Sequence, residues 1–358
     1  MQYGHFDDER REYVITTPTT PLPWINYLGS EDFFALVSNT AGGYCFYKDA
    51  RLRRITRYRY NGSPLDADGF HVYVRTEEGN VWNPGWQPTQ TPLDFYRCRH
   101  GLGYTVLTGT KDGLSLEQAM LVPREDRCML LKLTVQNQGE TTRHLKLFPY
   151  VEFCLWDAMD DSSNFQRNFS TGEVEIEPNA LYHKTEYRER RDHYAFFWAD
   201  RPYTGFDTSR DAFLGVYGSP ARPQAVLEGH CTGSQAHGWA PVGAMEFDLT
   251  LEPGAQQQLV LGLGYIENPQ EEKFVAPGVI NKTRAHAMME KYSSPAAFDR
   301  ALEDLRQFWG DLLGGCTAQT GDEKVDRMVN IWNQYQCMVT FNMSRSASYF
   351  ESGMGRGM

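Results

Sequence analysis

Short segments in which apolar and polar residues alternate run through the chain from its start to about residue 268. Alternation with a period of two is typical of β-strands that bury one face. Residues 131–135 and 144–148 alternate on either side of a turn-forming stretch, which predicts a β-hairpin, and residues 244–251 and 258–264 predict a second one. Many such strands, without long helical stretches between them, predict a large antiparallel sandwich of two sheets.

The pattern changes near residue 270, where helical spacing replaces alternation. Residues 278–292 are predicted to form one helix. A second helix is predicted to begin at Ser294, which is followed by a proline, and to end at Gly314, which is followed by another glycine. The apolar face of this second helix would consist of Phe298, Leu302, Leu305, Trp309 and Leu312.

A third helix is predicted after Asp322. Its apolar face would consist of Val325, Met328, Val329, Trp332 and Tyr335. One helix and the glycine-rich stretch that follows it cannot bury such a face alone, so we expect a further part of the protein to cover it. The sequence therefore predicts a β-sandwich over residues 1–270, a helical linker over 271–315 and the start of an all-α domain over 316–358.

The composition argues against several classes of function. The net charge is −11 and no basic run is long enough to follow a phosphate backbone, so we expect no nucleic-acid partner. The densest basic stretch, residues 51–59, is interleaved with apolar residues and predicts a strand. Without a membrane-length apolar run or a signal-peptide pattern, a cytoplasmic protein is expected. The seven cysteines are scattered and never form a CxxC pair, so neither a disulfide framework nor a metal site is predicted.

Two polar segments could carry chemistry. Residues 160–173 include Gln166 and Arg167, whose amide and guanidinium groups are suited to sugar hydroxyls, although a solvated surface loop is the alternative. Residues 344–356 include Arg345 and Arg356 among serines and glycines. Guanidinium groups, hydroxyls and exposed backbone N–H groups are suited to an oxyanion such as phosphate. The alternative there is a flexible connection with ordinary surface arginines.

At these segments the chain resembles the inverting glycoside phosphorylases, the family that contains cellobiose, cellodextrin and chitobiose phosphorylases. The resemblance runs through the whole chain in one order. It is carried by residues 3–8 (YGHFDD), 11–16 (REYVIT), 23–29 (PWINYLG), 39–44 (NTAGGY), 53–58 (RRITRY), 100–104 (HGLGY) and 344–358.

The resemblance implies a large amino-terminal β-sandwich, a helical linker and an (α/α)6 barrel that holds the active site. It implies reversible phosphorolysis of cellobiose into α-glucose 1-phosphate and glucose, with inversion at the anomeric carbon. Inorganic phosphate would be a co-substrate, and no metal or other cofactor is implied. A homodimer is implied, and the barrel segment beyond residue 358 would be required for activity.

The resemblance also assigns roles to single residues. Arg345 resembles the phosphate-binding arginine, and Arg356 resembles a ligand of the glucosyl unit that becomes glucose 1-phosphate. Gln166 and Arg167 resemble residues that reach a neighbouring subunit's site and contact the leaving glucose. The general-acid aspartate of the family would lie beyond residue 358, so no catalytic acid is expected within this chain.

Cellobiose is expected as the substrate because two segments, 164–168 and 343–348, resemble the cellobiose enzymes more than the chitobiose enzymes. Other interpretations remain open. The substrate could be a longer cellodextrin or another β-glucoside. The chain could also act as a non-catalytic sugar-binding or dimerisation module, or as a structural β protein with a helical tail.

Overall fold

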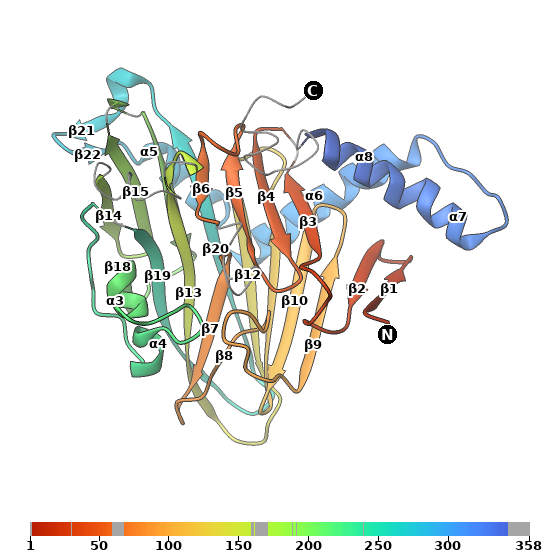
Figure 1. The fold of residues 1–358 in the computed structure, drawn as a ribbon, viewed down its shortest axis with the longest axis horizontal. Coiled ribbons are helices and arrows are strands. Elements are labelled where there is room, and N and C mark those ends of the chain that lie inside the picture. Colours follow the sequence, from red (N-terminus) through yellow and green to blue (C-terminus); the bar gives the residue numbers. More distant parts are fainter. Residues whose placement is uncertain are drawn as a thin grey trace.

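The computed structural model describes residues 2–29, 31–58, 68–158, 161, 171–187, 189–190, 192–238 and 240–342. In these residues two large antiparallel sheets stack face to face, and the longer helices cover the outer face of one of them (Figure 1). The predicted class, a large antiparallel sandwich followed by helices, is confirmed.

The larger sheet has 11 strands and carries the helices on its outer face. In spatial order its strands are β1 (Gly4–Asp7), β2 (Glu12–Ile15), β9 (Phe95–His100), β10 (Tyr104–Lys111), β11 (Leu114–Leu121), β12 (Cys128–Asn137), β20 (Gln256–Glu267), β17 (His193–Ala199), β15 (Ala180–Tyr187) and β14 (Thr171–Glu177), with β16 (Glu189–Arg190) beside β15.

The second sheet has nine strands. Its spatial order is β18 (Gly205–Ser209), β19 (Pro241–Leu251), β13 (Arg143–Trp156), β6 (Arg54–Thr56), β5 (Gly43–Tyr47), β4 (Phe33–Ser38) and β3 (Ile25–Gly29), with β7 (His71–Thr76) between β13 and β8 (Val81–Trp82). Two short helices, α3 (Arg210–Leu214) and α4 (Gln224–Glu228), pack against this sheet from outside.

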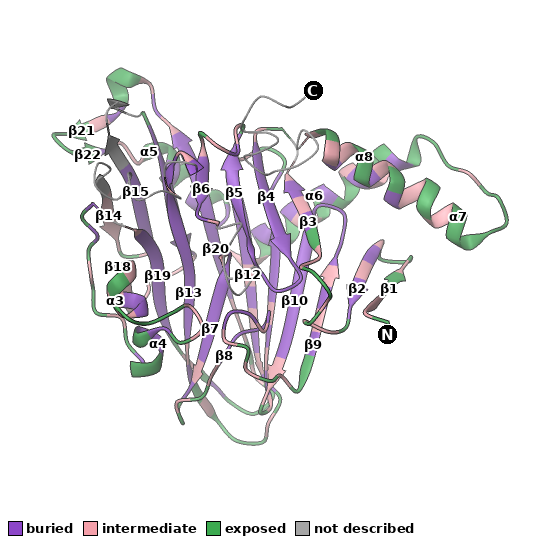
Figure 2. Ribbon diagram, in the orientation of Figure 1, coloured by how far each residue is buried: buried purple, intermediate pink, exposed green. Residues whose placement is uncertain are grey.

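The main core lies between the two sheets (Figure 2). Phe33 and Phe153 enter it from the nine-stranded sheet, and Phe197 and Tyr265 enter it from the 11-stranded sheet. All four side chains are almost completely buried. Burial of a large apolar side chain stabilises a fold by roughly 1.5–3 kcal/mol, so the interface between the sheets dominates the stability of this part of the chain.

Both predicted hairpins are wrong, although all four strands exist. β12 and β20 belong to the larger sheet, whereas β13 and β19 belong to the smaller one, so each connection crosses between sheets. The Asn137 side-chain amide donates to the carbonyl oxygens of Thr141 (2.8 Å) and Leu251 (3.0 Å). These bonds link the connection from β12 to β13 with the connection from β19 to β20. Local alternation identifies a strand but not its neighbours, because strand pairing depends on segments that are distant in sequence.

The helical part begins after β20 with the 3-10 turn Gln270–Glu272 and the small hairpin of β21 (Phe274–Ala276) and β22 (Val279–Ile280). The first predicted helix is therefore shorter than expected, and α5 spans Thr283–Lys291. The next helices are α6 (Pro295–Gly314), α7 (Glu323–Arg327), a π-helical turn (Met328–Trp332) and α8 (Asn333–Asn342).

The predicted limits of α6 are confirmed. The Ser294 hydroxyl accepts from the backbone N–H of Ala297 at 3.3 Å, and Pro295 occupies the first turn. The helix buries its apolar face against the larger sheet, with one correction at its end: Leu312 is 43% exposed, and Leu313 is buried instead.

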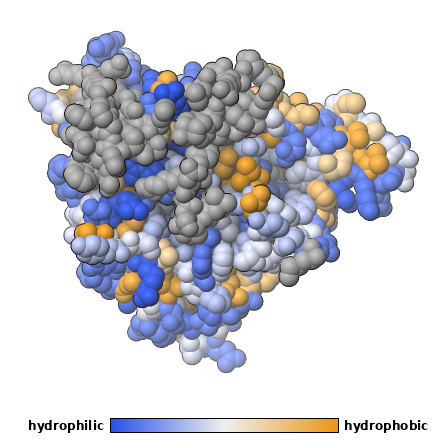
Figure 3. All heavy atoms as spheres, viewed as in Figure 1, coloured by the Kyte–Doolittle hydropathy of each residue, from blue (hydrophilic) through white to orange (hydrophobic). Residues whose placement is uncertain are grey.

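The third helix departs from the predicted pattern. Trp332 and Tyr335 are buried as expected, but Val325, Met328 and Val329 are each 37–43% exposed. The reason is that α7 and the turn after it project beyond the edge of the sheets, which leaves these three apolar side chains uncovered (Figure 1). Hydrophobic residues consequently lie among hydrophilic ones on the surface of this projecting segment (Figure 3).

Candidate functional site around Arg57 and Asp161

The four residues singled out from the sequence, Gln166, Arg167, Arg345 and Arg356, lie outside the described residues. Their predicted roles therefore remain predictions. The described structure does include Asp161, which precedes Gln166 by five positions in the chain. The surroundings of Asp161 show how the fold holds the chain where this polar segment begins.

Asp161 is held by a bidentate ion pair with Arg57. The Arg57 Nε and Nη2 atoms lie 2.6 Å from the two carboxylate oxygens, and the two side chains are only 9% and 5% exposed. The Asp161 carboxylate also accepts from the backbone N–H of Leu155 at 3.2 Å. A planar fork matched to a carboxylate fixes orientation as well as distance, so Asp161 has little freedom.

Glu152 extends this pair into a cluster of four charges. One of its oxygens lies 3.6 Å from Arg57 Nη1, and the other accepts from Arg210 Nε at 3.0 Å and from the Tyr150 hydroxyl at 2.8 Å. Burial by itself lowers the pKa of Arg57, but the carboxylates of Asp161 and Glu152 outweigh it and raise that pKa. Among the described residues two positive and two negative charges face one another, so the cluster holds the chain in place.

The backbone next to this cluster is also constrained. Trp156, the last residue of β13, has a φ of +73°, which is unusual for a bulky side chain, and it is completely buried. Its ring lies between His183, at 5.6 Å, and His193, at 4.4 Å, with Tyr265 at 5.8 Å. Such strain persists only where surrounding packing enforces it, and it occurs most often at functional positions.

The cluster was not predicted from the sequence. One signal was present: Glu152 is a carboxylate in the middle of a strand whose other residues are mostly apolar, and a buried charge requires a partner. The partners Arg57, Asp161 and Arg210 come from three other parts of the chain. No local pattern connects them.

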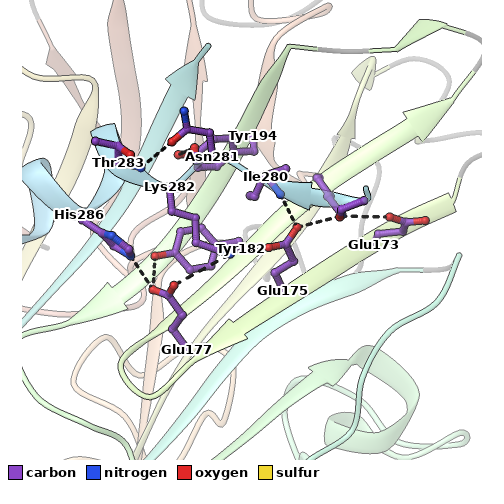
Figure 4. A network of polar contacts seen from close by, with 12 residues as sticks. Glu173, Glu175, Glu177, Tyr182, Tyr194, Ile280, Asn281, Lys282, Thr283 and His286 are labelled. Carbon is purple, nitrogen blue, oxygen red and sulfur yellow. Dashed lines mark hydrogen bonds and ion pairs between the residues drawn. The ribbon is translucent and has the colours of Figure 1, made fainter. Parts of the chain in front are cut away.

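A second polar network joins the larger sheet to the start of the helical part (Figure 4). Glu175 on β14 accepts from Lys184 Nζ at 2.8 Å, from Lys282 Nζ at 2.5 Å and from the backbone N–H of Ile280 at 2.9 Å. Burial would raise the pKa of Glu175, but the two lysines and the Ile280 N–H lower it overall. The network fixes the linker to the sheet edge.

The described residues contain no group of three or more His, Cys, Asp or Glu side chains that could hold a metal ion. In the same residues, none of the helices combines the length and the apolar character needed to cross a bilayer.

The fold is a supersandwich domain followed by the beginning of a helical catalytic domain. The chain belongs to glycosyl hydrolase family 94: residues 11–295 match the supersandwich domain of this family, and residues 308–358 match its catalytic domain. The expected family is thereby confirmed.

Several known relatives are glycoside phosphorylases. The chain is 30% identical to N,N'-diacetylchitobiose phosphorylase of Vibrio furnissii, with all of this chain and 43% of that protein aligned. It is 28% identical to 3-O-beta-D-glucopyranosyl-beta-D-glucuronide phosphorylase of Paenibacillus borealis, with 97% of this chain and 42% of that protein aligned. The chain thus spans less than half the length of these relatives.

Two further similarities show the breadth of the fold. The cyclic beta-(1,2)-glucan synthase NdvB of Rhizobium meliloti is 29% identical, with 98% of this chain and 12% of that protein aligned. A solved structure of a kojibiose-phosphorylase-like protein from the human microbiome has a TM-score of 0.56 at 9% identity, and it covers 96% of this chain and 42% of that one. The second likeness concerns the fold alone.

Proposed function

We propose that this chain forms the amino-terminal part of a glycoside phosphorylase whose substrate is cellobiose. The observation that carries the proposal is the match to both domains of family 94 in order, together with relatives named as phosphorylases of several disaccharides. The products would be α-glucose 1-phosphate and glucose. Phosphate serves as a co-substrate, and the reaction uses no other cofactor.

In the proposed reaction a phosphate oxygen attacks the anomeric carbon from the face opposite the leaving group. The bond from this carbon to the glycosidic oxygen breaks, a carboxylic acid protonates that oxygen, and the configuration inverts. An inverting hydrolase needs a second carboxylate to activate water. Phosphate is already an anionic nucleophile, so positive charge and hydrogen-bond donors that hold it in line replace that second carboxylate. Arg345 is proposed to supply this charge.

The segment with Gln166 and Arg167 is proposed to contact the leaving glucose in a neighbouring subunit, which requires a homodimer. The ion pair of Arg57 with Asp161 supports this role because it fixes the chain five residues before Gln166. Because the ion pair already restricts the start of the segment, the segment would lose less conformational entropy when it binds a sugar. We place the reaction in the cytoplasm.

Known relatives differ in the sugar on which they act. They are named as phosphorylases of N,N'-diacetylchitobiose, of a glucosyl glucuronide and of solabiose, and one is named as a glucan synthase. The family therefore accommodates different sugars on a shared supersandwich. A longer cellodextrin or another β-glucoside is the alternative substrate.

The test uses the protein with a complete catalytic domain. Release of α-glucose 1-phosphate is measured with cellobiose, cellotriose, chitobiose and solabiose at fixed phosphate concentration. The expected result is the highest kcat/KM for cellobiose, and an absence of phosphate-dependent cleavage of any disaccharide contradicts the proposal. Arg345→Ala is expected to raise the KM for phosphate.

A non-catalytic sugar-binding module is the competing class of function. It predicts that cellobiose binds to residues 1–342 without the rest of the catalytic domain. Calorimetric titration of this shorter chain with cellobiose distinguishes the two, because the phosphorylase proposal expects no binding without the barrel.

A further inference from the structure

Tyr335 on α8 joins the helical part to both sheets at one point. Its hydroxyl accepts from the backbone N–H of Gly103 at 3.0 Å, and it lies 2.9 Å from Asn26 Oδ1 and 3.1 Å from the Tyr27 carbonyl oxygen, the two acceptors for its proton. Tyr335 is 1% exposed. Because Gly103 follows β9 and Asn26 lies on β3, one phenol contacts both sheets.

Asn26 strengthens this junction. It is 5% exposed, and its side-chain amide donates to the carbonyl oxygens of Gly101 and Tyr104, each at 2.9 Å. The amide thus bridges the two sheets, while its oxygen faces Tyr335. A buried polar network in which the groups are mutually bonded specifies one arrangement, since any shift leaves a donor or acceptor without a partner.

The amino-terminal hairpin of β1 and β2 holds the same helical segment from a second side. Arg327 Nε and Nη2 lie 2.5 and 2.6 Å from the two carboxylate oxygens of Asp8, in the turn of this hairpin. One turn of helix later, the Trp332 ring lies 5.5 Å from that of Phe6 on β1. β1 is the edge strand of the larger sheet, so the edge of this sheet packs against the helical segment.

These contacts act on a helix that leads directly to the proposed phosphate-binding segment. α8 ends at Asn342, three residues before Arg345. Val325, Met328 and Val329, on the turns that precede α8, are exposed. The position of α8 relative to the sheets therefore depends on the apolar packing of Trp332, Tyr335 and Val339. The polar contacts of Tyr335 and Arg327 add direction to that packing.

We propose that Tyr335 is a positioning residue for phosphate binding: with Asn26 and the pair Asp8–Arg327, it fixes the end of α8 and thus the place from which the chain continues to Arg345. This inference rests on the proposed phosphorylase function and deepens it. A small displacement of the end of α8 would shift the point from which the chain continues to Arg345, and misplacement of a binding group weakens binding and rate strongly.

The first test is Tyr335→Phe in the protein with a complete catalytic domain. Loss of one hydroxyl leaves the N–H of Gly103 and the oxygen of Asn26 without this partner, and we expect the KM for phosphate to rise about fivefold or more. The KM for cellobiose should change by less than twofold. The matched control is Tyr73→Phe, which removes a buried hydroxyl 2.8 Å from the Pro220 carbonyl on the other sheet and should leave both values unchanged.

The second test is a charge exchange that does not remove buried contacts. Asp8→Arg and Arg327→Asp are each expected to raise the KM for phosphate severalfold, and the double variant should restore it, because the exchanged pair can form again. If the variants lose thermal stability while the phosphate KM stays at the wild-type value, or if the double variant fails to restore it, the positioning role is wrong. A wild-type protein without phosphate-dependent cleavage overturns the proposed function and this role together.

Discussion

The guanidinium of Arg57 and the carboxylate of Asp161 meet through two N···O contacts of 2.6 Å, although 104 positions separate them in the sequence. Both are almost completely buried. The pair therefore joins the residue that follows β6 to the segment that follows β13.

Asp161→Asn is expected to lower the free energy of unfolding by about 3 kcal/mol, because it leaves the Arg57 guanidinium buried with only Glu152 opposite it. Urea denaturation measures this loss. In the phosphorylase the same variant should raise the KM for glucose in the synthetic direction more than the KM for glucose 1-phosphate. Asp7→Asn, which removes the partner of the exposed Arg10, serves as the control and should have no measurable effect on stability.

Gly103→Ala should destabilise the contact between α6 and the larger sheet. Gly103 has a φ of +78°, and an added Cβ would lie 3.0 Å from Trp309 Nε1 and 3.1 Å from a methyl group of Leu305. We expect a loss of about 2 kcal/mol, of which about 1 kcal/mol is backbone strain. Gly233→Ala isolates the strain, since Gly233 has a φ of +72° and no atom within 4 Å of its Cβ position. If chemical denaturation shows that both variants lose the same free energy of unfolding, the packing contribution at Gly103 is contradicted.

Stability should depend on pH through His100. Burial lowers its pKa to about 4, and its ring nitrogens contact the Thr105 hydroxyl at 2.9 Å and the Trp24 carbonyl oxygen at 3.1 Å. The native state thus keeps His100 neutral in a range where the unfolded chain binds a proton, with an ordinary pKa near 6.5. As pH falls from about 6.5 to about 4, the unfolded state gains protons first, and stability decreases by a few kcal/mol.

His100→Gln should remove this dependence. The variant is expected to be less stable than wild type at pH 7, because the contacts of the ring are altered, and the difference should shrink at pH 4.5. Urea unfolding at the two pH values measures the difference in the free energy of unfolding between variant and wild type. The same substitution at the exposed His5 is the control; a difference that stays constant for His100→Gln would show that its protonation is not coupled to folding.

Glu175→Gln should weaken the attachment of the linker to the sheet. The carboxylate binds Lys184 and Lys282 and is 15% exposed, so its replacement by an amide is expected to cost about 2 kcal/mol. Since the pKa of Glu175 is lowered in the native state, its contribution is present above the ordinary carboxyl pKa and is lost as pH falls through the lowered value.

The control for this position is Glu173→Gln on the same strand. Glu173 lies 3.5 Å from Lys184 Nζ but is 43% exposed, so solvent screens its charge. The two variants are compared by thermal unfolding at pH 7. A drop in Tm for Glu173→Gln as large as that for Glu175→Gln would contradict the assignment of Glu175 as the anchor.

The sequence alone determined the class of the fold, the family and the limits of α6. These depend on local information: a period of two for strands, a Ser-Pro pair that caps a helix, and short motifs in a fixed order. Only the tertiary structure decided that β12 and β13 lie in different sheets, that Val325 faces solvent while Tyr335 is buried, and that Arg57 meets Asp161. Sheet pairing and buried ion pairs depend on which distant segments come together, and the free energy that selects them comes from burial of the whole core rather than from any local pattern.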